Sequence, residues 1–402
     1  MKAIVCGGSI GGLFCAAALR TAGWDVTVVE RSPVEISGRG AGIVTHPALI
    51  DALERVGAGT KDLGVAIEGR AAIDQAGSLV DMLPHKQIVT SWDRVRELLR
   101  VIVPEGGYEL DRTLSRYHDT GDSVAAQFED GTVMEGDILV GADGFRSAVR
   151  GQMLPDVSPR YAGYVAWRAL AEESALSQDF REHLFGTFSL YAPSGMQVLG
   201  YPIAGAANDL TPGRRHYNFG WYAAYDEATL ADMLTDETGT HHDVSIPPPL
   251  IRASVLAQME RAAQERLPTP LLEVLKVGER PFFTPIYDYC SPTFAAGRVA
   301  LAGDAACLAR PHVGMGVTKA AGDALALADA LTAGPVEQAL AAYSDVRVPV
   351  ARTAYERAQM LGRYVFSEAS GGAANPDGRN HPHLRDVLTL TAVDCSDAAA
   401  PT

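Results

Sequence analysis

The chain has 402 residues, of which 47% are hydrophobic and 21% are charged, and this length predicts two closely packed domains. Its formal net charge of −15 argues against nucleic acid or an anionic membrane surface as a partner. No apolar run approaches the roughly 20 residues that span a bilayer. Five scattered cysteines, with no CxxC pair among them, favour reduced thiols in the cytoplasm over a disulfide framework.

The N-terminal segment predicts a strand, a tight turn, a helix and a second strand. Residues 3–6 form a short apolar run, residues 13–22 are rich in Ala and Leu, and residues 26–29 form a buried strand that ends at Glu30. This order predicts a parallel sheet with crossover helices. Further strand-like runs at 137–140 and 298–302 each lead into a turn that contains Gly and Asp.

The middle of the chain has a different character. Segments 188–191, 197–203 and 217–222 are rich in aromatic and β-branched residues, which favours an antiparallel sheet between residues 161 and 287. Helices and loops are expected from residue 230 to about 270, and a helix with an apolar face from 316 to 331. After residue 370 we expect a tail that lies over the surface or is partly disordered.

The first turn has the spacing of a dinucleotide-binding motif. It reads Gly7-Gly8-Ser9-Ile10-Gly11-Gly12, which is G-x-G-x-x-G with Ser9 in the second glycine position. Gly7 permits the tight turn, Gly12 permits close packing of helix on strand, and the helix N-terminus presents free N–H groups to a pyrophosphate. Glu30 is placed to accept the hydroxyls of an adenosine ribose, with Arg31 beside it. The alternative is a turn that binds no ligand.

Two later motifs resemble the paired signatures of the flavin-dependent aromatic hydroxylases, the family of p-hydroxybenzoate hydroxylase. They are Gly141-Ala142-Asp143-Gly144 and Gly303-Asp304-Ala305-Ala306. The resemblance implies that Asp143 lies near the FAD pyrophosphate and takes part in nicotinamide binding. It implies that Asp304 binds the ribityl chain of FAD.

Other segments are similar to the dihydroxypyridine hydroxylase branch of that family, and the likeness runs from the first strand to about residue 370. These segments are residues 163–168, Tyr201-Pro202-Ile203, Gly42-Ile43-Val44 and Arg310-Pro311-His312. The resemblance implies an α/β fold (α+β overall), with a Rossmann-type FAD-binding domain and a smaller, mainly antiparallel β-sheet substrate domain. The expected FAD-binding domain comprises residues 1–72, 93–160 and 286–370, the substrate domain comprises 73–92 and 161–285, and the C-terminal tail comprises 371–402.

The resemblance also implies an activity. FAD reduced by NADH or NADPH would react with O2 to a C4a-hydroperoxide, which hydroxylates a small electron-rich aromatic ring such as a hydroxylated pyridine. Such chemistry requires a dry site. The loop Pro311 to Gly316, with Gly314 in it, would direct its amides at the flavin, where aligned dipoles stabilise the reduced ring. A homodimer is a possible assembly.

Three side chains are candidates for catalysis. His312 lies in the flavin loop, and His46 follows the segment expected beside the flavin, so either histidine is a candidate to deprotonate a ring hydroxyl. Arg168 is a candidate to hold an oxygen of the substrate or the flavin. The alternatives are ordinary packing roles for the histidines and an interdomain ion pair for Arg168.

The sequence departs from the family pattern at two positions. Cys307 stands where many members have a histidine, and Trp92 where many have an FAD-contacting arginine, for which Arg94 or Arg96 is a possible substitute. The WxWxIP signature of flavin halogenases is absent, and His241-His242 lacks the partners of a metal site, so we expect no metal. A non-catalytic protein or another flavin-binding protein on this scaffold, such as an oxidase, a reductase or a ligand-binding module, remains the alternative function.

Overall fold

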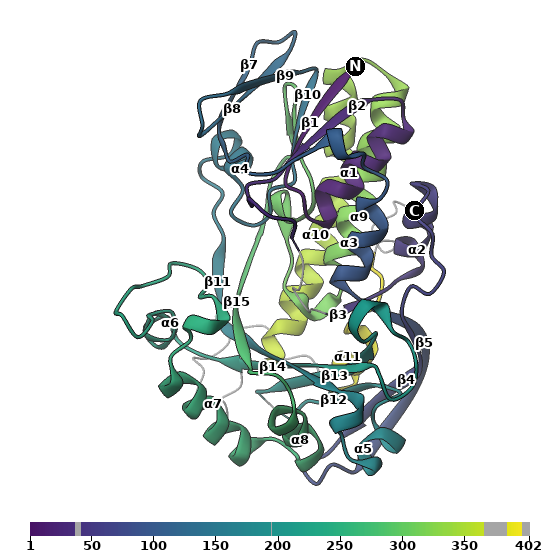
Figure 1. Ribbon diagram of the computed structural model, residues 1–402, viewed down its shortest axis with the longest axis vertical. Coiled ribbons are helices and arrows are strands. Elements are labelled where there is room, and N and C mark those ends of the chain that lie inside the picture. Colours follow the sequence, from purple (N-terminus) through teal and green to yellow (C-terminus); the bar gives the residue numbers. More distant parts are fainter. Residues whose placement is uncertain (37–41, 194, 366–383, 396–402) are drawn as a thin grey trace.

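The computed structural model describes residues 1–36, 42–193, 195–365 and 384–395. Two large sheets lie one above the other along the long axis of the molecule (Figure 1), and the long strands β11 and β15 run between them. The chain begins beside the upper sheet.

The upper sheet has six strands. Its inner strands are parallel, because β1 pairs with both β2 and β10, and β10 pairs with β17. Their side chains are buried almost without exception, as expected for a sheet that is covered on both faces. In spatial order the strands are β16 (Ala295–Ala296), β17 (Val299–Leu301), β10 (Ile138–Gly141), β1 (Lys2–Cys6), β2 (Asp25–Val29) and β6 (Tyr108–Glu109).

Helix α1 (Ile10–Thr21) packs against β1 and β2 of the upper sheet, and α3 (Trp92–Arg100) and α9 (Gly316–Ala333) pack against α1. Helix α1 is built from small and apolar residues, and Leu13, Phe14 and Cys15 have no exposed surface. A separate three-stranded sheet stands next to the upper sheet (Figure 1). It consists of β7 (Leu114–Asp119), β8 (Val124–Phe128) and β9 (Val133–Gly136).

The lower sheet has nine strands and is mostly antiparallel; β12 and β4 form a parallel pair. In spatial order its strands are β18 (Cys307–Leu308), β15 (Phe282–Cys290), β11 (Arg160–Glu172), β14 (His216–Ala224), β13 (Gln197–Ile203), β12 (Phe188–Tyr191), β4 (Val65–Ile73), β5 (Leu79–Ser91) and β3 (Gly42–Val44).

Alternation along these strands gives the lower sheet two different faces. Trp167, Phe219 and Trp221 point to one face, where they join a hydrophobic core with residues of helices α5 to α8. Of these helices, α7 and α8 lie below the sheet in Figure 1. Arg168, on the strand with Trp167, has its side chain on the opposite face, which is turned toward the upper sheet. The second face of this sheet therefore lies outside the core formed with helices α5 to α8.

The remaining helices surround these sheets. Helix α10 is long, contains Pro349, and packs against α9 and β15. The helices not yet given bounds are α2 (Pro47–Arg55), α4 (Ala148–Met153), α5 (Gln178–His183), α6 (Glu227–Met233), α7 (Ala253–Arg266), α8 (Thr269–Val277), α10 (Val336–Gly362) and α11 (Leu384–Leu390).

The expected FAD-binding domain includes residues 1–72, and the structure places both β3 and β4, which extends to Ile73, in the lower sheet. Within the expected C-terminal tail, residues 384–395 lie against the rest of the protein, with Val387, Leu388 and Cys395 buried. Both arrangements depend on contacts with distant parts of the chain, which leave no local signal.

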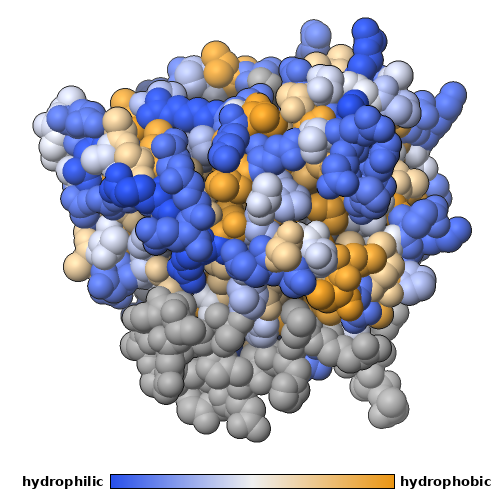
Figure 2. All heavy atoms as spheres, turned by 90° about the horizontal axis from the view of Figure 1, so that it is seen from below, coloured by the Kyte–Doolittle hydropathy of each residue, from blue (hydrophilic) through white to orange (hydrophobic). Residues whose placement is uncertain are grey.

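The surface is mainly hydrophilic on the face seen from below, with hydrophobic residues in smaller groups (Figure 2). Within the described ranges, no helix combines the length and the apolar character that a membrane span requires.

Candidate active site

The glycine turn after β1 has the geometry that close packing requires. Gly7 has a φ of +111°, and a Cβ atom there would overlap the carbonyl oxygen of Ala142. A Cβ on Gly12 would overlap the carbonyl oxygen of Gly7. Ser9 is the N-cap residue of α1, although its side chain makes no capping hydrogen bond. The turn thus leaves backbone amides at the helix N-terminus available to a phosphate group.

Glu30 at the end of β2 is buried, with 6% of its surface exposed. Its carboxylate oxygens accept hydrogen bonds from the amides of Gly8 (2.7 Å) and Ser32 (2.9 Å). Tyr108 donates its hydroxyl to the Gly8 carbonyl at 3.1 Å. Glu30 therefore fixes the glycine turn. It also borders a large cavity that is lined by residues of both the upper and the lower sheet.

Asp143 lies at the end of β10. One carboxylate oxygen, Oδ2, accepts from the amides of Ala148 (2.7 Å) and Val149 (3.3 Å) at the start of α4. The other, Oδ1, is buried and has no hydrogen-bond partner among the described residues. Burial raises the pKa of Asp143 against the effect of these hydrogen bonds. An unpartnered buried oxygen beside the glycine turn marks a place where a ligand donor fits.

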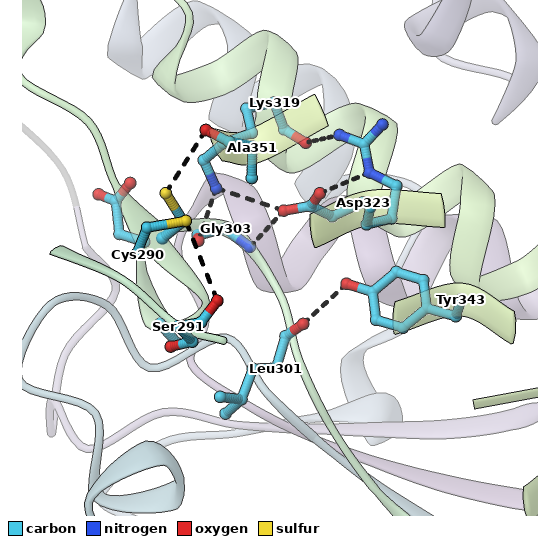
Figure 3. Close-up of polar contacts among 12 residues, drawn as sticks. Cys290, Ser291, Leu301, Gly303, Lys319, Asp323, Tyr343 and Ala351 are labelled. Carbon is cyan, nitrogen blue, oxygen red and sulfur yellow. Dashed lines mark hydrogen bonds and ion pairs between the residues drawn. The ribbon is translucent and has the colours of Figure 1, made fainter. Parts of the chain in front are cut away.

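A buried charge network holds the Gly303-Asp304 turn (Figure 3). Lys319 donates to the carbonyl of Gly303 at 2.7 Å and pairs with Asp323 at 3.3 Å. Asp323 also accepts from the amide of Gly303 (2.9 Å) and from Arg347 (2.8 Å). Because both backbone groups of Gly303 are fixed, this network determines where the next residue, Asp304, projects.

Asp304 borders the cavity and is accessible from it. The protein around it still raises its pKa, and Lys319 opposes that rise. Asp304 thus presents a carboxyl group to the cavity, with the buried cation of Lys319 nearby.

The loop before α9 ends at the N-terminus of that helix, which is 18 residues long. Gly314 has a φ of +63°, the left-handed region that favours glycine. The first helical residue, Gly316, borders the cavity. The positive end of the helix dipole is thus directed at the cavity, where it stabilises negative charge on a bound group.

His312 in this loop has no exposed surface. Its Nε2 atom lies 2.7 Å from the Tyr164 hydroxyl, and its ring centroid lies 4.5 Å from that of Tyr222. Burial, with the nearby Arg310, lowers the pKa of His312 to about 3. The histidine is therefore neutral at physiological pH and connects the loop to the lower sheet.

One face of the lower sheet forms the floor of the cavity. The strand register places alternate residues of β11, β14, β13 and β12 on this face. The floor residues are Ala166, Arg168, Phe188, Leu199, Tyr201, Asn218, Gly220 and Tyr222. They combine an apolar surface with a few polar groups, which is the usual composition of a small-molecule site.

Arg168 is the cation of this floor. It is half-buried, and no described residue forms an ion pair or hydrogen bond with its guanidinium. Burial raises the pKa of the Tyr201 and Tyr222 hydroxyls, and Arg168 opposes that rise at both, which places the three groups close together. The guanidinium is thus free to bind an oxygen anion of a ligand.

A single cavity of about 1120 Å³ connects these features. Of the residues expected to bind FAD, all but Gly12 border it, and Gly12 packs behind the turn. His312 and Arg168 also border it, and the bordering residues expected for FAD are Gly7, Ser9, Gly11, Glu30, Arg31, Gly42, Asp143, Asp304, Pro311, Gly314 and Gly316.

His46 is not among the residues that border the cavity. It is 2% exposed, and its Nδ1 atom lies 2.8 Å from the Thr318 hydroxyl in the first turn of α9. The structure therefore separates His46 from the other two catalytic candidates. A histidine that follows a strand-like segment gives no sequence signal of whether its ring turns toward a ligand or a neighbouring helix.

The expected substitutes for the missing arginine also lie elsewhere. Trp92 borders the cavity, but Arg94 and Arg96 do not. Arg94 interacts with Glu97, and Arg96 pairs with Glu35. Arg112, which the sequence reading did not single out, borders the cavity.

The residues present fit FAD. The glycines pack so closely that a Cβ would fill the turn, Asp143 has an unpartnered oxygen, and the cavity extends from Glu30 to the sheet floor. FAD needs a long cavity of this kind, with a phosphate cradle, a carboxylate at one ribose and a helix N-terminus at the flavin.

Sequence reasoning missed the Lys319–Asp323–Arg347 network and most of the floor. For the network a signal existed, because Lys319 and Asp323 stand one helical turn apart in a helix rich in Ala and Leu. For the floor, the register of four strands decides which residues share a face, and no local pattern gives that register.

Comparison with known proteins agrees with this geometry. Residues 161–288 match a family model described as FAD binding domain-like, and residues 257–358 match one described as FAD binding domain. The chain is 33% identical over 330 residues to 2,6-dihydroxypyridine 3-monooxygenase of Paenarthrobacter nicotinovorans, with 82% of each chain covered. It is 29% identical over 362 residues to aurachin C monooxygenase/isomerase of Stigmatella aurantiaca, with 87% of this chain and 85% of that one covered.

The fold is similar to that of a solved structure over almost its whole length. The 2,6-dihydroxypyridine-3-hydroxylase of Arthrobacter nicotinovorans superposes with a TM-score of 0.85 at 29% identity, with 94% of this chain and 95% of that chain covered. The expected Rossmann-type fold, the FAD cofactor and the hydroxylase activity are therefore confirmed. This chain belongs to the family of FAD-dependent aromatic monooxygenases.

Proposed function

We propose that the protein hydroxylates a small, electron-rich ring that carries an ionisable hydroxyl group, with a hydroxylated pyridine as the first choice and a simple phenol as the second. The observation that carries this proposal is the free guanidinium of Arg168 on an otherwise mainly apolar floor. The similarity to a dihydroxypyridine monooxygenase supports the N-heteroaromatic class.

Arg168 is proposed to bind the ring oxygen as its anion. A cation a few ångströms from a hydroxyl group lowers the pKa of that group by about 1–3 units. The substrate would therefore ionise at neutral pH without a strong base. The ring itself would lie over Gly220, with Leu199 and Phe188 providing apolar contact.

His312 is proposed to position the flavin loop and not to act as the base. A group with a pKa of about 3 takes a proton from a phenol too weakly to serve as a general base at neutral pH. Although His312 borders the cavity, it is buried and its Nε2 atom is already engaged with the Tyr164 hydroxyl. For His46, whose Nδ1 atom lies beside Thr318, we propose a packing role.

FAD would be held by the residues that border the upper part of the cavity. Glu30 and the glycine turn are proposed to bind the adenosine half, Asp143 the pyrophosphate region, and Asp304 the ribityl chain. When bound and reduced by NADH or NADPH, FAD would activate O2, so that one oxygen atom of O2 enters the ring and the other leaves as water. The N-terminus of α9 would stabilise the negative charge of the reduced flavin.

We propose two closely packed domains, with β3 and β4 assigned to the substrate side because they belong to the lower sheet. We also propose a cytoplasmic location, which the free thiol state of the five cysteines supports.

A homodimer is a further proposal, supported by the exposed Leu79 and Val80 on β5. Sedimentation or light scattering of the purified protein tests it.

A substrate panel tests the proposed function. Purified protein loaded with FAD is mixed with NADH or NADPH and with hydroxylated pyridines, phenols and bicyclic heteroaromatics, and nicotinamide oxidation and product mass are recorded. We expect a dihydroxylated pyridine to stimulate oxidation most and to gain one oxygen atom. Stimulation by none of these compounds would refute the proposal.

A further inference from the structure

The C-terminal segment 384–395 forms part of the wall of the cavity. Thr391 and Ala392, directly after α11, border the cavity next to His312 and Gly314. The Ala392 amide donates to the His312 carbonyl at 2.9 Å. A Cβ atom on Gly314 would lie 3.0 Å from both Cα and Cβ of Ala392. The segment is therefore in close contact with the loop before α9.

Arg70 on β4 anchors this segment from behind. Its guanidinium donates to the carbonyls of Leu388 (3.1 Å), Thr391 and Ala392 (3.0 Å). Arg70 is 2% exposed, and no described carboxylate forms an ion pair with it. Burial lowers its pKa to about 10. The backbone carbonyls of the segment are thus the groups that compensate this buried charge.

Other contacts complete the docking. Gln87 on β5 donates to the carbonyls of Ala392 (3.2 Å) and Thr45 (2.9 Å). Ala392 has a φ of +54°, a left-handed conformation that non-glycine residues adopt rarely. Since the last carbonyls of a helix lack partners within the helix, a cation at that end is favourable. The carbonyl acceptors of the segment and the guanidinium donor of Arg70 therefore satisfy each other.

Arg70 itself does not border the cavity. Its guanidinium lies 5.4 Å from the centre of the Phe188 ring, and Phe188 stacks on Tyr201 with a centroid distance of 5.2 Å. Arg70 thus contacts the back of the cavity floor and the C-terminal segment at the same time. Loss of its side chain would free the segment without removing any group that lines the cavity.

We propose that Arg70 is a positioning residue that holds Thr391 and Ala392 against the flavin loop as a wall of the active site, and that this wall limits the access of water to the bound flavin. The second part rests on the proposed function, because it takes the flavin to lie beside the Pro311–Gly314 loop. The first part concerns the protein alone.

Hydrogen exchange followed by mass spectrometry tests the anchor. In Arg70→Met we expect exchange of the amides in residues 384–395 to become about 10- to 100-fold faster, the factor for losing a hydrogen bond to a charged group. In Arg70→Lys, which retains the charge, amide exchange should be faster than in the original protein and slower than in Arg70→Met. Lys86→Met on the neighbouring strand β5 is the control, because Lys86 is exposed and its ion pair in the described part of the chain is with the exposed Glu68. Unchanged exchange in Arg70→Met would overturn the anchor.

Quenching of flavin fluorescence by iodide tests the wall without turnover. We expect bound FAD to be quenched more strongly in Arg70→Met than in the original protein and in Lys86→Met. Leu388→Asp provides a second route, since it buries a charge under the segment and leaves Arg70 intact, and it should increase both exchange and quenching. If exchange rises in these variants while quenching stays the same, the wall is refuted. Neither measurement requires a substrate, so a negative substrate panel leaves the test intact.

Discussion

The Nε2 atom of His312 and the hydroxyl oxygen of Tyr164 lie 2.7 Å apart, and both side chains are fully buried. Arg310 also interacts with the Tyr164 hydroxyl oxygen, which directs the hydroxyl proton to His312. This arrangement stabilises the neutral imidazole and disfavours the imidazolium. It has consequences both for stability and for the pH dependence of activity.

The folded state should lose stability as the pH falls from about 6.5 to about 3. The pKa of His312 is lowered from 6.5 to about 3 in the folded protein, so over this range the unfolded chain binds a proton that the folded chain does not. The free energy of unfolding then decreases by up to about 1.4 kcal/mol per pH unit from this residue. Urea unfolding of His312→Gln across this range checks it, since the variant should show a shallower decrease.

The pH profile of turnover separates the two roles considered for His312. If it only positions the loop, His312→Gln should lower activity by a similar factor at every pH. If it is the base that ionises the substrate, the defect should shrink at higher pH, where the substrate ionises unaided. We expect the first result, measured as substrate-dependent NADH oxidation.

Replacement of Glu30 should weaken FAD binding. Glu30→Leu removes the acceptor of the Gly8 and Ser32 amides and the carboxylate proposed for the ribose. The loss of two hydrogen bonds to a charged group costs on the order of 3 kcal/mol, a hundredfold or more in Kd. Fluorescence titration with FAD measures it, with Glu135→Leu on the exposed edge of β9 as the control. An unchanged Kd would leave Glu30 with a structural role alone.

Asp304→Ala should leave FAD binding largely intact but lower the fraction of NADH oxidation that yields hydroxylated product. The adenosine contacts remain, so the protein should keep FAD, but the flavin loses the proposed contact at its ribityl chain. We expect a larger share of the NADH electrons to appear as hydrogen peroxide in place of hydroxylated product. A variant with the coupling of the original protein would contradict the role given to Asp304.

Removal of Lys319 should destabilise the fold strongly. Lys319→Met leaves Asp323 with one cationic partner, Arg347, and removes the charged donor from the Gly303 carbonyl, which keeps only the Ala306 amide. Breaking a buried ion pair from one side typically costs about 3–5 kcal/mol. Thermal unfolding measures the change, and Lys61→Met on the surface is the matched control. A decrease no larger than in that control would show that the network is dispensable.

The sequence predicted the parts of the fold that local patterns specify. Strands β12 and β13 have the expected bounds, and α9 begins at Gly316 as expected, because alternation and helical periodicity are local properties. The residues proposed to bind FAD could be named from the sequence because glycines and acidic residues at strand ends form a motif with a physical role.

The remainder depends on contacts between distant residues. Arg70 meets Ala392 across 322 positions of the chain, and a helix of seven residues such as α11 has too few turns for a periodic signal. The position of His46 also depends on a distant contact, because its ring pairs with Thr318 and does not face the cavity. These residues could be assigned only once the strands of the lower sheet were in register.

The most direct test of the central claim is hydroxylation of a dihydroxypyridine under ¹⁸O2 by the original protein and by Arg168→Met, with Arg160→Met on the same strand as the control. For the original protein we expect a product that carries one ¹⁸O atom. For Arg168→Met we expect a KM raised about 10- to 100-fold at neutral pH, the factor for one hydrogen bond to a charged group, with partial recovery at higher pH. Incorporation of oxygen from water, or an Arg168→Met variant with the KM and pH profile of Arg160→Met, would contradict the account.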